Sequence, residues 1–334
     1  MVNFILNSNV FADNNKYYSN DKGILSIMYH RFNEDKYPST NIDMEIFKKQ
    51  INLIQKEKIN FINPNDFKLN FNIPKLKKEI LLTVDDGFAS FYQNAWPYLK
   101  EKKIPFILFV STEAVGKNGY MNWKQIKEIE KEKFVFIGNH SHSHEYLVKY
   151  NFLKFKNDID SSIKIFIENI GYNPLFFSYP FGEYSLEQKK YISSKFDFAF
   201  GQQSGIIDIN KDKYELPRFP INVKYGDLKR FSFLLKLFPL EYKNIIPEDK
   251  YILQSKNPPK TIIEFFEEQK NLDKINCFSD EGNKWDKSEV NLIENKLQIK
   301  FRDKFTFRRG RINCSLNDDI GWRWLGIQFS IEQN

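Results

Sequence analysis

The chain of 334 residues is long enough for one large domain and a smaller one. Hydrophobic residues make up 41% of it and charged residues 28%, which excludes a mainly disordered protein. Fifty basic against 43 acidic residues give a mild formal net charge of +7, which adds little support for nucleic-acid binding but allows attraction to an anionic substrate or membrane surface. Cys277 and Cys314 could pair, but they make neither a disulfide framework nor a metal-binding spacing, so we expect buried free thiols in a reducing compartment.

Strand and helix patterns alternate through the first two thirds of the chain. Residues 1–22 are polar and rich in Asn, and we expect a loosely held lead-in. The apolar patterns predict strands at 24–29, 59–62, 81–84, 104–110, 134–137, 175–179 and 196–200, and helices at 42–56, 90–102, 123–132, 151–170 and 185–194. Such alternation predicts an α/β fold with a parallel sheet, and the number of units favours a barrel whose site lies at the carboxyl ends of the strands.

The pattern changes after about residue 240. We expect the barrel domain to span 23–245, a basic, Pro-containing linker to follow at 246–270, and a small β-rich domain to occupy 271–334. Its predicted strands are 290–292, 297–301, 305–307, 312–316 and 322–331. The same region holds Trp285, Trp322 and Trp324 with Arg308, Arg309 and Arg311, which would either stack on sugar rings or fill the core of a small sheet.

The N-terminal residues give an expectation about location. Met1 to Asp13 shows no basic region followed by an apolar core and a small-residue cleavage site, and no run approaches the roughly 20 apolar residues of a membrane span. We therefore expect a cytoplasmic protein without a transmembrane segment, with peripheral membrane contact left open. The sequence does not predict an oligomeric state.

Two adjacent carboxylates end the predicted strand at 81–84. Asp85 and Asp86 would repel each other without a compensating charge, and Gly87 lets the chain turn directly after them. A bound cation is the usual remedy, with one carboxylate on the metal and the other free to accept a proton. The alternative is a solvated Asp-Gly turn after a strand.

Three of the four histidines lie within five residues. His140 and His144 are four apart, which places both imidazoles on one side of a helical turn or tight loop. With Asp86 they would form a site of two histidines and one carboxylate with open positions, which suits zinc or another divalent transition metal. His142 lies between them, and we expect it to point away from the metal in a structural or supporting role. The alternative for the cluster is an exposed polar loop.

Together these motifs resemble those of the polysaccharide deacetylase family, the NodB-homology or family 4 carbohydrate esterases. Thr83–Gly87 resembles the first family motif, His140–His144 the second and Ser178–Gly182 the third. The resemblance spans roughly residues 24 to 225 and implies a distorted (β/α) barrel of the NodB type.

The resemblance also implies roles for individual residues. Asp85 would be the catalytic base, Asp86, His140 and His144 would hold a divalent metal, most often zinc, and the Phe181 backbone N–H would face the oxyanion. The implied reaction removes an N-acetyl group from an amino sugar in a glycan or glycan precursor. A deformylase or another amidase would use the same residues, and a catalytically inactive carbohydrate-binding protein is the alternative from another class. Nucleic-acid binding ranks third.

The sequence departs from the family pattern at two points. Ser178 stands where the third motif usually has an arginine, so Arg218 is the candidate bidentate partner of Asp85, the alternative being a surface arginine. No histidine follows His144 to serve as the acid. A circularly permuted branch, similar to the poly-N-acetylglucosamine deacetylases of biofilms, carries that histidine on the first strand. By this resemblance His30 is the general acid, the alternative being a hydrogen-bonded structural histidine.

Overall fold

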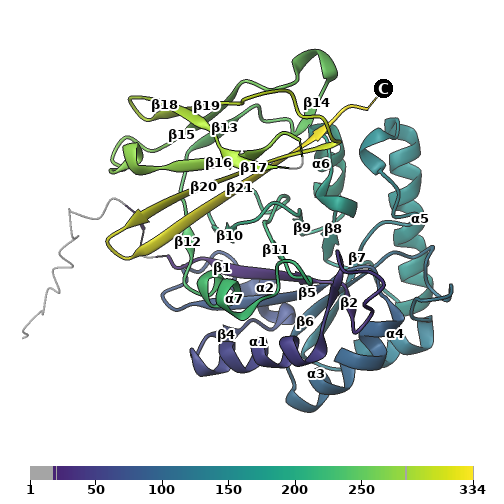
Figure 1. The fold of residues 1–334 in the computed structure, drawn as a ribbon. Coiled ribbons are helices and arrows are strands. Elements are labelled where there is room, and N and C mark those ends of the chain that lie inside the picture. The colour runs from purple at the N-terminus through teal and green to yellow at the C-terminus, as the bar shows by residue number, and fades with distance from the viewer. Residues whose placement is uncertain (1–17, 20, 283, 334) are drawn as a thin grey trace, which may run out of the picture.

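The computed structural model describes residues 18–19, 21–282 and 284–333, so most of the expected lead-in at 1–22 lies outside the described residues. An α/β half-barrel forms the lower part of the molecule in Figure 1, and a layer of β-sheets lies on top of it. Among the helices described, none combines the length and the apolar character that crossing a bilayer requires.

The half-barrel is a curled sheet of nine strands in the order β10-β1-β5-β6-β7-β8-β9, with β4 paired to β5 and β11 to β1. Only β10 runs antiparallel to its neighbour, and the other pairings in this sheet are parallel. The predicted distorted (β/α) barrel is therefore confirmed. The strands are β1 Ile24–Tyr29, β4 Asn60–Phe61, β5 Glu79–Val84, β6 Phe106–Val110, β7 Val135–Asn139, β8 Phe176–Ser178, β9 Phe198–Phe200, β10 Ile206–Ile207 and β11 Phe219–Pro220. A separate short pair joins β2 Arg31–Phe32 to β3 Asn41–Ile42.

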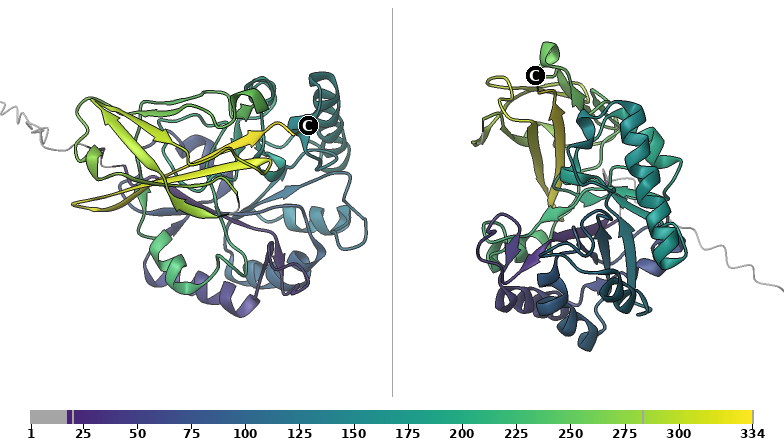
Figure 2. Two further views of the ribbon diagram at one scale, coloured as in Figure 1. Left: turned by 45° about the horizontal axis from the view of Figure 1, so that its top comes forward. Right: turned by 90° about the vertical axis from the view of Figure 1, so that its right-hand side faces the viewer.

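Helices cover the outer face of this sheet (Figure 2). Local sequence signals set where several of them begin: the Asp43 carboxylate caps α1, and reciprocal capping boxes start α4 at Asn122 and α6 at Ser185. The longest helix, α5, is capped by Asn151 and ends at Gly171, which has a φ of 85°. The helices are α1 Met44–Lys56, α2 Pro64–Asn70, α3 Trp96–Lys102 (preceded by a π-helical turn at Phe91–Ala95), α4 Trp123–Glu130, α5 Phe152–Ile170, α6 Leu186–Ser193 and α7 Leu228–Leu234.

Strand β6 shows how the two faces of the barrel sheet are filled. Phe106, Leu108 and Val110 face the helices, whereas Ile107 and Phe109 face the interior, as the two-residue period of a strand requires. The interior core is rich in phenylalanine, and Phe67 of α2 closes it from below, with ring centroids 5.0 to 6.4 Å from three strand phenylalanines. This closed floor leaves the carboxyl ends of the strands as the place where polar side chains meet.

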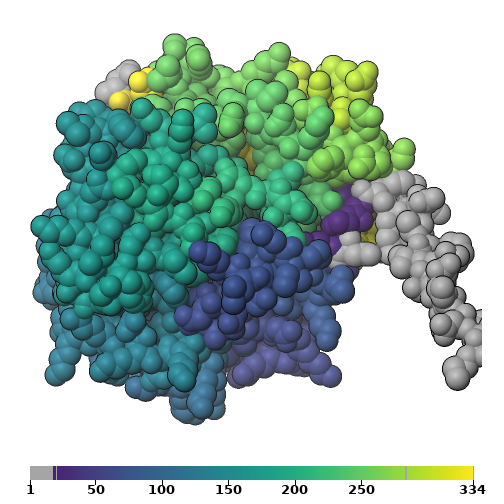
Figure 3. All heavy atoms as spheres, turned by 180° about the vertical axis from the view of Figure 1, so that it is seen from behind, coloured from purple at the N-terminus to yellow at the C-terminus, as the bar shows by residue number. Residues whose placement is uncertain are grey.

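The C-terminal region packs two sheets around a core of its own and covers one side of the barrel (Figure 3). Contact with the barrel is close: a Cβ on Gly326 would lie 2.0 Å from the Ser204 carbonyl oxygen, and the Trp324 ring lies 6.2 Å from that of Phe219. The six-stranded sheet contains β12 Phe238–Pro239, β14 Tyr251–Ile252, β16 Asn276–Asp280, β17 Trp285–Lys287, β20 Arg309–Asp318 and β21 Gly321–Ile331. The four-stranded sheet contains β13 Asn244–Ile246, β15 Thr261–Glu264, β18 Glu289–Ile293 and β19 Lys296–Lys300.

Two expectations about this region are corrected. Residues 246–270 are not a linker, because β14 pairs with β21 and β15 pairs with β13 and β19 inside the C-terminal sheets. Residues 305–307 form no strand, although apolar and polar residues alternate there. Phe305 exchanges hydrogen bonds with the Asn257 side-chain amide, which takes the place of a neighbouring strand.

The expectation of free thiols is also wrong. Cys277 and Cys314 lie directly opposite each other on β16 and β20, and they form a disulfide. Both residues are buried, as expected. Disulfides persist mainly in oxidising compartments, so this bond weighs against the cytoplasmic location, which stays a prediction.

Candidate metal centre and active site

The carboxyl ends of β1, β5, β7 and β8 bring the candidate residues together. The Asp85 N–H donates to the Tyr29 carbonyl at 2.9 Å, so the residue after β5 lies beside the end of β1 and the adjacent His30. Strand β7 ends at Asn139, directly before His140, and pairs with β8 at Phe177. Residues from separate parts of the chain therefore meet at one edge of the sheet, as the parallel topology predicts.

Asp86, His140 and His144 form a compact cluster of metal-ligating atoms. The Asp86 Oδ1 atom lies 3.3 Å from His140 Nε2 and 3.0 Å from His144 Nε2, and the three ligand atoms lie within 4.8 Å of one another. Burial would raise the pKa of Asp86, but the adjacent imidazoles of His144 and His140 hold it well below its usual range. This is the set of side chains that the sequence predicted for a metal.

The hydrogen bonds around the cluster leave its lone pairs without a partner. His140 Nδ1 lies 2.7 Å from the Ser178 carbonyl oxygen, which only accepts, so this nitrogen donates and, in a neutral imidazole, Nε2 is left with a lone pair for a metal. The Asp86 Oδ1 atom is buried and accepts no hydrogen bond from any residue that the structure describes. A buried carboxylate oxygen aimed at the lone pair of an imidazole needs a positive charge between them. The residues present therefore fit a divalent cation, and the donor set of two nitrogens and one oxygen suits zinc.

Helix α5 holds the histidine loop in place. The buried Asp158 side chain accepts hydrogen bonds from the backbone N–H of His142 at 2.9 Å and of Ser143 at 3.1 Å. One turn further along, Ser162 bonds to Asn139 at 2.8 Å. Sequence reasoning missed these two supports. The signal was available, because both are polar residues on the apolar face of the helix predicted at 151–170.

The backbone at the site adopts conformations that residues other than glycine rarely take. Four such residues have a positive φ: Asp86 at 74°, Ser141 at 69°, His144 at 53° and Phe181 at 59°. Each conformation costs free energy and persists only where the surrounding structure enforces it, and such residues concentrate at functional sites. The clustering of four of them supports a functional interpretation of this edge of the sheet.

Asp85 forms a buried ion pair with Arg218. Arg218 Nη1 lies 2.6 Å from Asp85 Oδ1 and Nη2 lies 2.8 Å from Oδ2, and both side chains are fully buried. The alternative of a surface arginine is therefore wrong. Burial would raise the pKa of Asp85, but the Arg218 guanidinium, together with the nearby imidazoles of His140 and His30, outweighs burial and the pKa is lowered. Ser178, which stands where the family motif has an arginine, accepts a further bond from Arg218 Nη2 at 2.7 Å.

His30 lies among the charged groups of the site. Burial lowers the pKa of its imidazole, whereas the charges of Asp86 and Asp85 act in the opposite direction. His30 directly follows β1, and the Tyr29 carbonyl at the end of that strand accepts from the Asp85 N–H, so the first strand brings His30 to the edge of the sheet that carries Asp85. Its role as an acid stays a prediction.

The Phe181 backbone N–H is free to bind a ligand. In the Pro180–Gly182 turn, the Gly182 N–H donates to the Tyr179 carbonyl at 2.9 Å and the Glu183 N–H to the Pro180 carbonyl at 3.2 Å. The Phe181 N–H donates to no residue within the described part of the chain. The Phe181 ring lies 4.9 Å from the His144 ring, so this turn borders the metal cluster.

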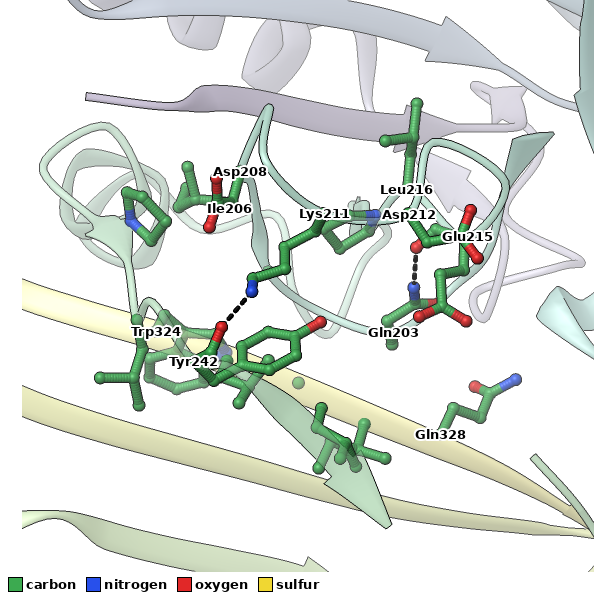
Figure 4. Close-up of a pocket in the computed structure, with 18 of the residues that line it drawn as sticks. Gln203, Ile206, Asp208, Lys211, Asp212, Glu215, Leu216, Tyr242, Trp324 and Gln328 are labelled. Atoms are coloured by element: carbon green, nitrogen blue, oxygen red, sulfur yellow. Dashed lines mark hydrogen bonds between the residues drawn. The ribbon is translucent and has the colours of Figure 1, made fainter. Parts of the chain in front are cut away.

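Two features near the cluster lie outside it. His142 Nδ1 is 2.9 Å from the Thr112 hydroxyl, and its ring does not take part in the Asp86 cluster. A cavity of about 60 Å³ between the barrel and the C-terminal sheets is lined by Lys211, Tyr242 and other polar and apolar residues (Figure 4). It has room for a few water molecules but not for a sugar unit, and it contains none of the metal-cluster residues.

Comparison with known proteins agrees with this geometry. Residues 72–198 match the family model described as polysaccharide deacetylase. Over these residues, which make up less than half of the chain, the sequence is similar to polysaccharide deacetylases. Its relatives include the poly-β-1,6-N-acetyl-D-glucosamine N-deacetylase of Staphylococcus aureus strain MRSA252, which is 24% identical over 199 residues, covering 54% of this chain and 68% of the relative.

Solved structures show the same fold for the barrel. IcaB from Ammonifex degensii superposes with a TM-score of 0.57 at 23% identity, covering 64% of this chain and 97% of that one. The Streptococcus pyogenes deacetylase PplD, solved in complex with acetate, gives 0.56 at 20% identity, covering 61% and 95%. Each of these proteins is covered almost completely, although about a third of this chain lies outside each match.

Proposed function

We propose that the protein is a metal-dependent N-deacetylase that hydrolyses the acetamide of an amino sugar in an N-acetylated glycan. The observation that carries the proposal is the arrangement of Asp86, His140 and His144 beside a second carboxylate, Asp85, that is held by Arg218. The Staphylococcus aureus relative is named for deacetylating poly-β-1,6-N-acetyl-D-glucosamine, and this polymer is the first substrate to test.

Asp86, His140 and His144 would hold the cation, with zinc the proposed metal. A divalent cation bound there supplies Lewis-acid chemistry: it polarises the acetyl carbonyl and makes water easier to deprotonate. Both Asp85 oxygens receive bonds from Arg218, so this carboxylate keeps a fixed orientation and stays ionised.

The remaining steps use side chains and backbone of this chain. Asp85 removes a proton from the attacking water, and the new carbon–oxygen bond turns the carbonyl oxygen into an oxyanion. The Phe181 N–H donates to this oxyanion. The carbon–nitrogen bond then breaks, and His30, in its protonated form, delivers a proton to the leaving amine. The products are acetate and a free amino sugar.

The test is acetate release from a β-1,6-linked N-acetylglucosamine pentamer by the zinc-loaded full chain. Asp85→Asn should abolish release while keeping the metal. The matched control is Asp66→Asn, which changes an exposed aspartate on α2 and should leave the rate unchanged. Stoichiometric zinc without turnover would instead favour a carbohydrate-binding protein, and release of formate from N-formylated sugars would favour a deformylase.

The cytoplasmic location is a separate prediction from the proposed activity. The Cys277–Cys314 disulfide is the observation against it, because cytosolic thiols are kept reduced. Labelling of free thiols in the native protein, extracted without a reductant, measures this directly: two reactive thiols after unfolding would support the cytoplasm, and none would contradict it.

A further inference from the structure

The turn that carries the Phe181 N–H is held from outside the barrel. Gln328, on strand β21 of the C-terminal sheets, donates from Nε2 to the carbonyl oxygens of both Phe181 and Gly182 at 3.0 Å. Gln328 is 7% exposed and rises from β21 at the edge of the interdomain cavity (Figure 4). One side-chain amide from the second region therefore fixes two consecutive peptide groups of the turn.

A second contact joins the same two parts of the molecule. Arg308, directly before β20, donates from Nη1 to the Glu183 carboxylate at 2.7 Å. Its guanidinium lies 4.4 Å from the centre of the Phe181 ring and 3.8 Å from that of Tyr146. The turn is thus bound through its carbonyls by Gln328 and through its side chains by Arg308.

The turn needs this support because its backbone is not a low-energy one. Phe181 has a φ of 59° and a ψ of 4°, in the left-handed region that residues other than glycine rarely adopt. Gly182 follows with a φ of 70°, and a Cβ there would lie 2.5 Å from the Gln202 nitrogen. The Phe181 N–H belongs to the peptide group between Pro180 and Phe181, so the orientation of that group decides where the N–H points. Gln328 bonds to the carbonyl of the next peptide group, between Phe181 and Gly182, and so limits its rotation.

We propose that Gln328 is a positioning residue for the active site: the C-terminal sheets hold the 180–182 turn so that the Phe181 N–H points at the site of reaction. The C-terminal region is then part of the catalytic unit and not a separable module. This inference rests on the proposed deacetylation for its kinetic consequence, but the ordering of the turn is measurable without turnover.

The test compares Gln328→Met with Gln298→Met in the zinc-loaded full chain. Both variants replace one amide by an apolar group of similar length, but Gln298 lies on β19 in the other C-terminal sheet. On the β-1,6-linked N-acetylglucosamine pentamer, kcat of Gln328→Met should fall about 10- to 100-fold while KM stays within about twofold. Zinc content should equal that of the wild type, and Gln298→Met should keep the wild-type kcat.

Hydrogen exchange over residues 176–184 provides the readout that is independent of activity. Exchange should rise at least about tenfold in Gln328→Met and stay unchanged in Gln298→Met. Unchanged exchange, a kcat within about twofold of the wild type, or an equal loss in both variants would overturn the inference. If Gln328→Met does not fold, Gln328→Glu takes its place. The glutamate has the same length, but its carboxylate cannot donate to the two carbonyl oxygens, so kcat should fall and exchange should rise as in Gln328→Met.

If the wild-type chain releases no acetate, the proposed function fails, and the exchange comparison still decides the positioning role. If the wild type turns over and only the Gln328 effects are missing, the inference alone fails.

Discussion

Removing Arg218 and its partner Asp85 together should destabilise the protein far less than the sum of the two single removals. Both side chains are fully buried, and Arg218→Met would leave the Asp85 carboxylate without its two strong donors at 2.6 and 2.8 Å. Opposite unit charges about 4 Å apart attract by about 4 kcal/mol at an effective dielectric constant of about 20. This agrees with the roughly 3–5 kcal/mol that loss of one partner of a buried pair costs.

The assay is a double-mutant cycle on metal-free protein, so that the cation does not contribute. The free energy of unfolding is measured in urea for the wild type, Arg218→Met, Asp85→Asn and the double variant. Each single variant should lose about 3–5 kcal/mol, and the double variant should lose at most about 1 kcal/mol more than either single one. The coupling energy between the two positions should therefore be at least about 2 kcal/mol.

An exposed ion pair in the same barrel is the matched control. Lys48 and Glu45 on α1 lie 3.1 Å apart with side chains 43% and 71% exposed. Their cycle should give a coupling of about 0.2–1 kcal/mol, because solvent screens the pair. Additive losses for Arg218 and Asp85, with a coupling energy no larger than that of the control, would refute the argument that this buried pair fixes the base.

Two further predictions concern single side chains. His30→Ala should lower kcat by roughly 100- to 10,000-fold with zinc content unchanged, as expected for the loss of a positioned acid; a rate within about threefold of the wild type would leave His30 a structural residue. Burial raises the pKa of Glu183 from 4.5 to about 7, although Arg308 and Arg309 oppose the rise. The stability that this group contributes is present below pH 4.5 and lost as the pH rises through about 7, a loss of about 3 kcal/mol. Glu183→Gln should remove this loss of stability, so the thermal unfolding midpoints of the variant and the wild type should diverge between pH 5 and 8. Midpoints that change in parallel with pH would contradict the raised pKa of Glu183.

The barrel could be predicted because each of its strands and helices is recognisable from a short stretch of neighbouring residues. Buried strands such as 24–29 and 104–110 are continuous apolar runs, and capped amphipathic helices separate them. The candidate site followed because residues directly after parallel strands meet at one edge of the sheet. The spacing of His140 and His144 needed no tertiary information.

The remaining site residues depend on contacts that sequence spacing does not reveal. Arg218 and Asp85 are 133 positions apart, and nothing in the sequence separated a buried partner from a surface arginine. Asp158 left a readable signal as a polar residue on an apolar helix face. Gln328 left none, because a glutamine within a strand does not indicate that its amide will bind two carbonyls of another domain.

The errors in the C-terminal region have physical causes. Prolines at 247, 258 and 259 suggested a linker, yet β14 between them and β15 after them both pair within the sheets. The alternation of apolar and polar residues around Phe305 suggested a strand, yet the Phe305 N–H and carbonyl are hydrogen-bonded to the Asn257 side-chain amide and not to another strand. The disulfide depends on the pairing register of β16 and β20, which places Cys277 opposite Cys314 with their Cα atoms 4.0 Å apart.

The central claim is that one divalent cation is held by Asp86, His140 and His144. Its most direct test is metal content by mass spectrometry, after zinc loading and dialysis, of the wild type and His140→Ala, with His142→Ala as the matched histidine control. We expect about one zinc per chain in the wild type and in His142→Ala, and almost none in His140→Ala. A wild type without zinc, or a His140→Ala variant that keeps it, would contradict the claim.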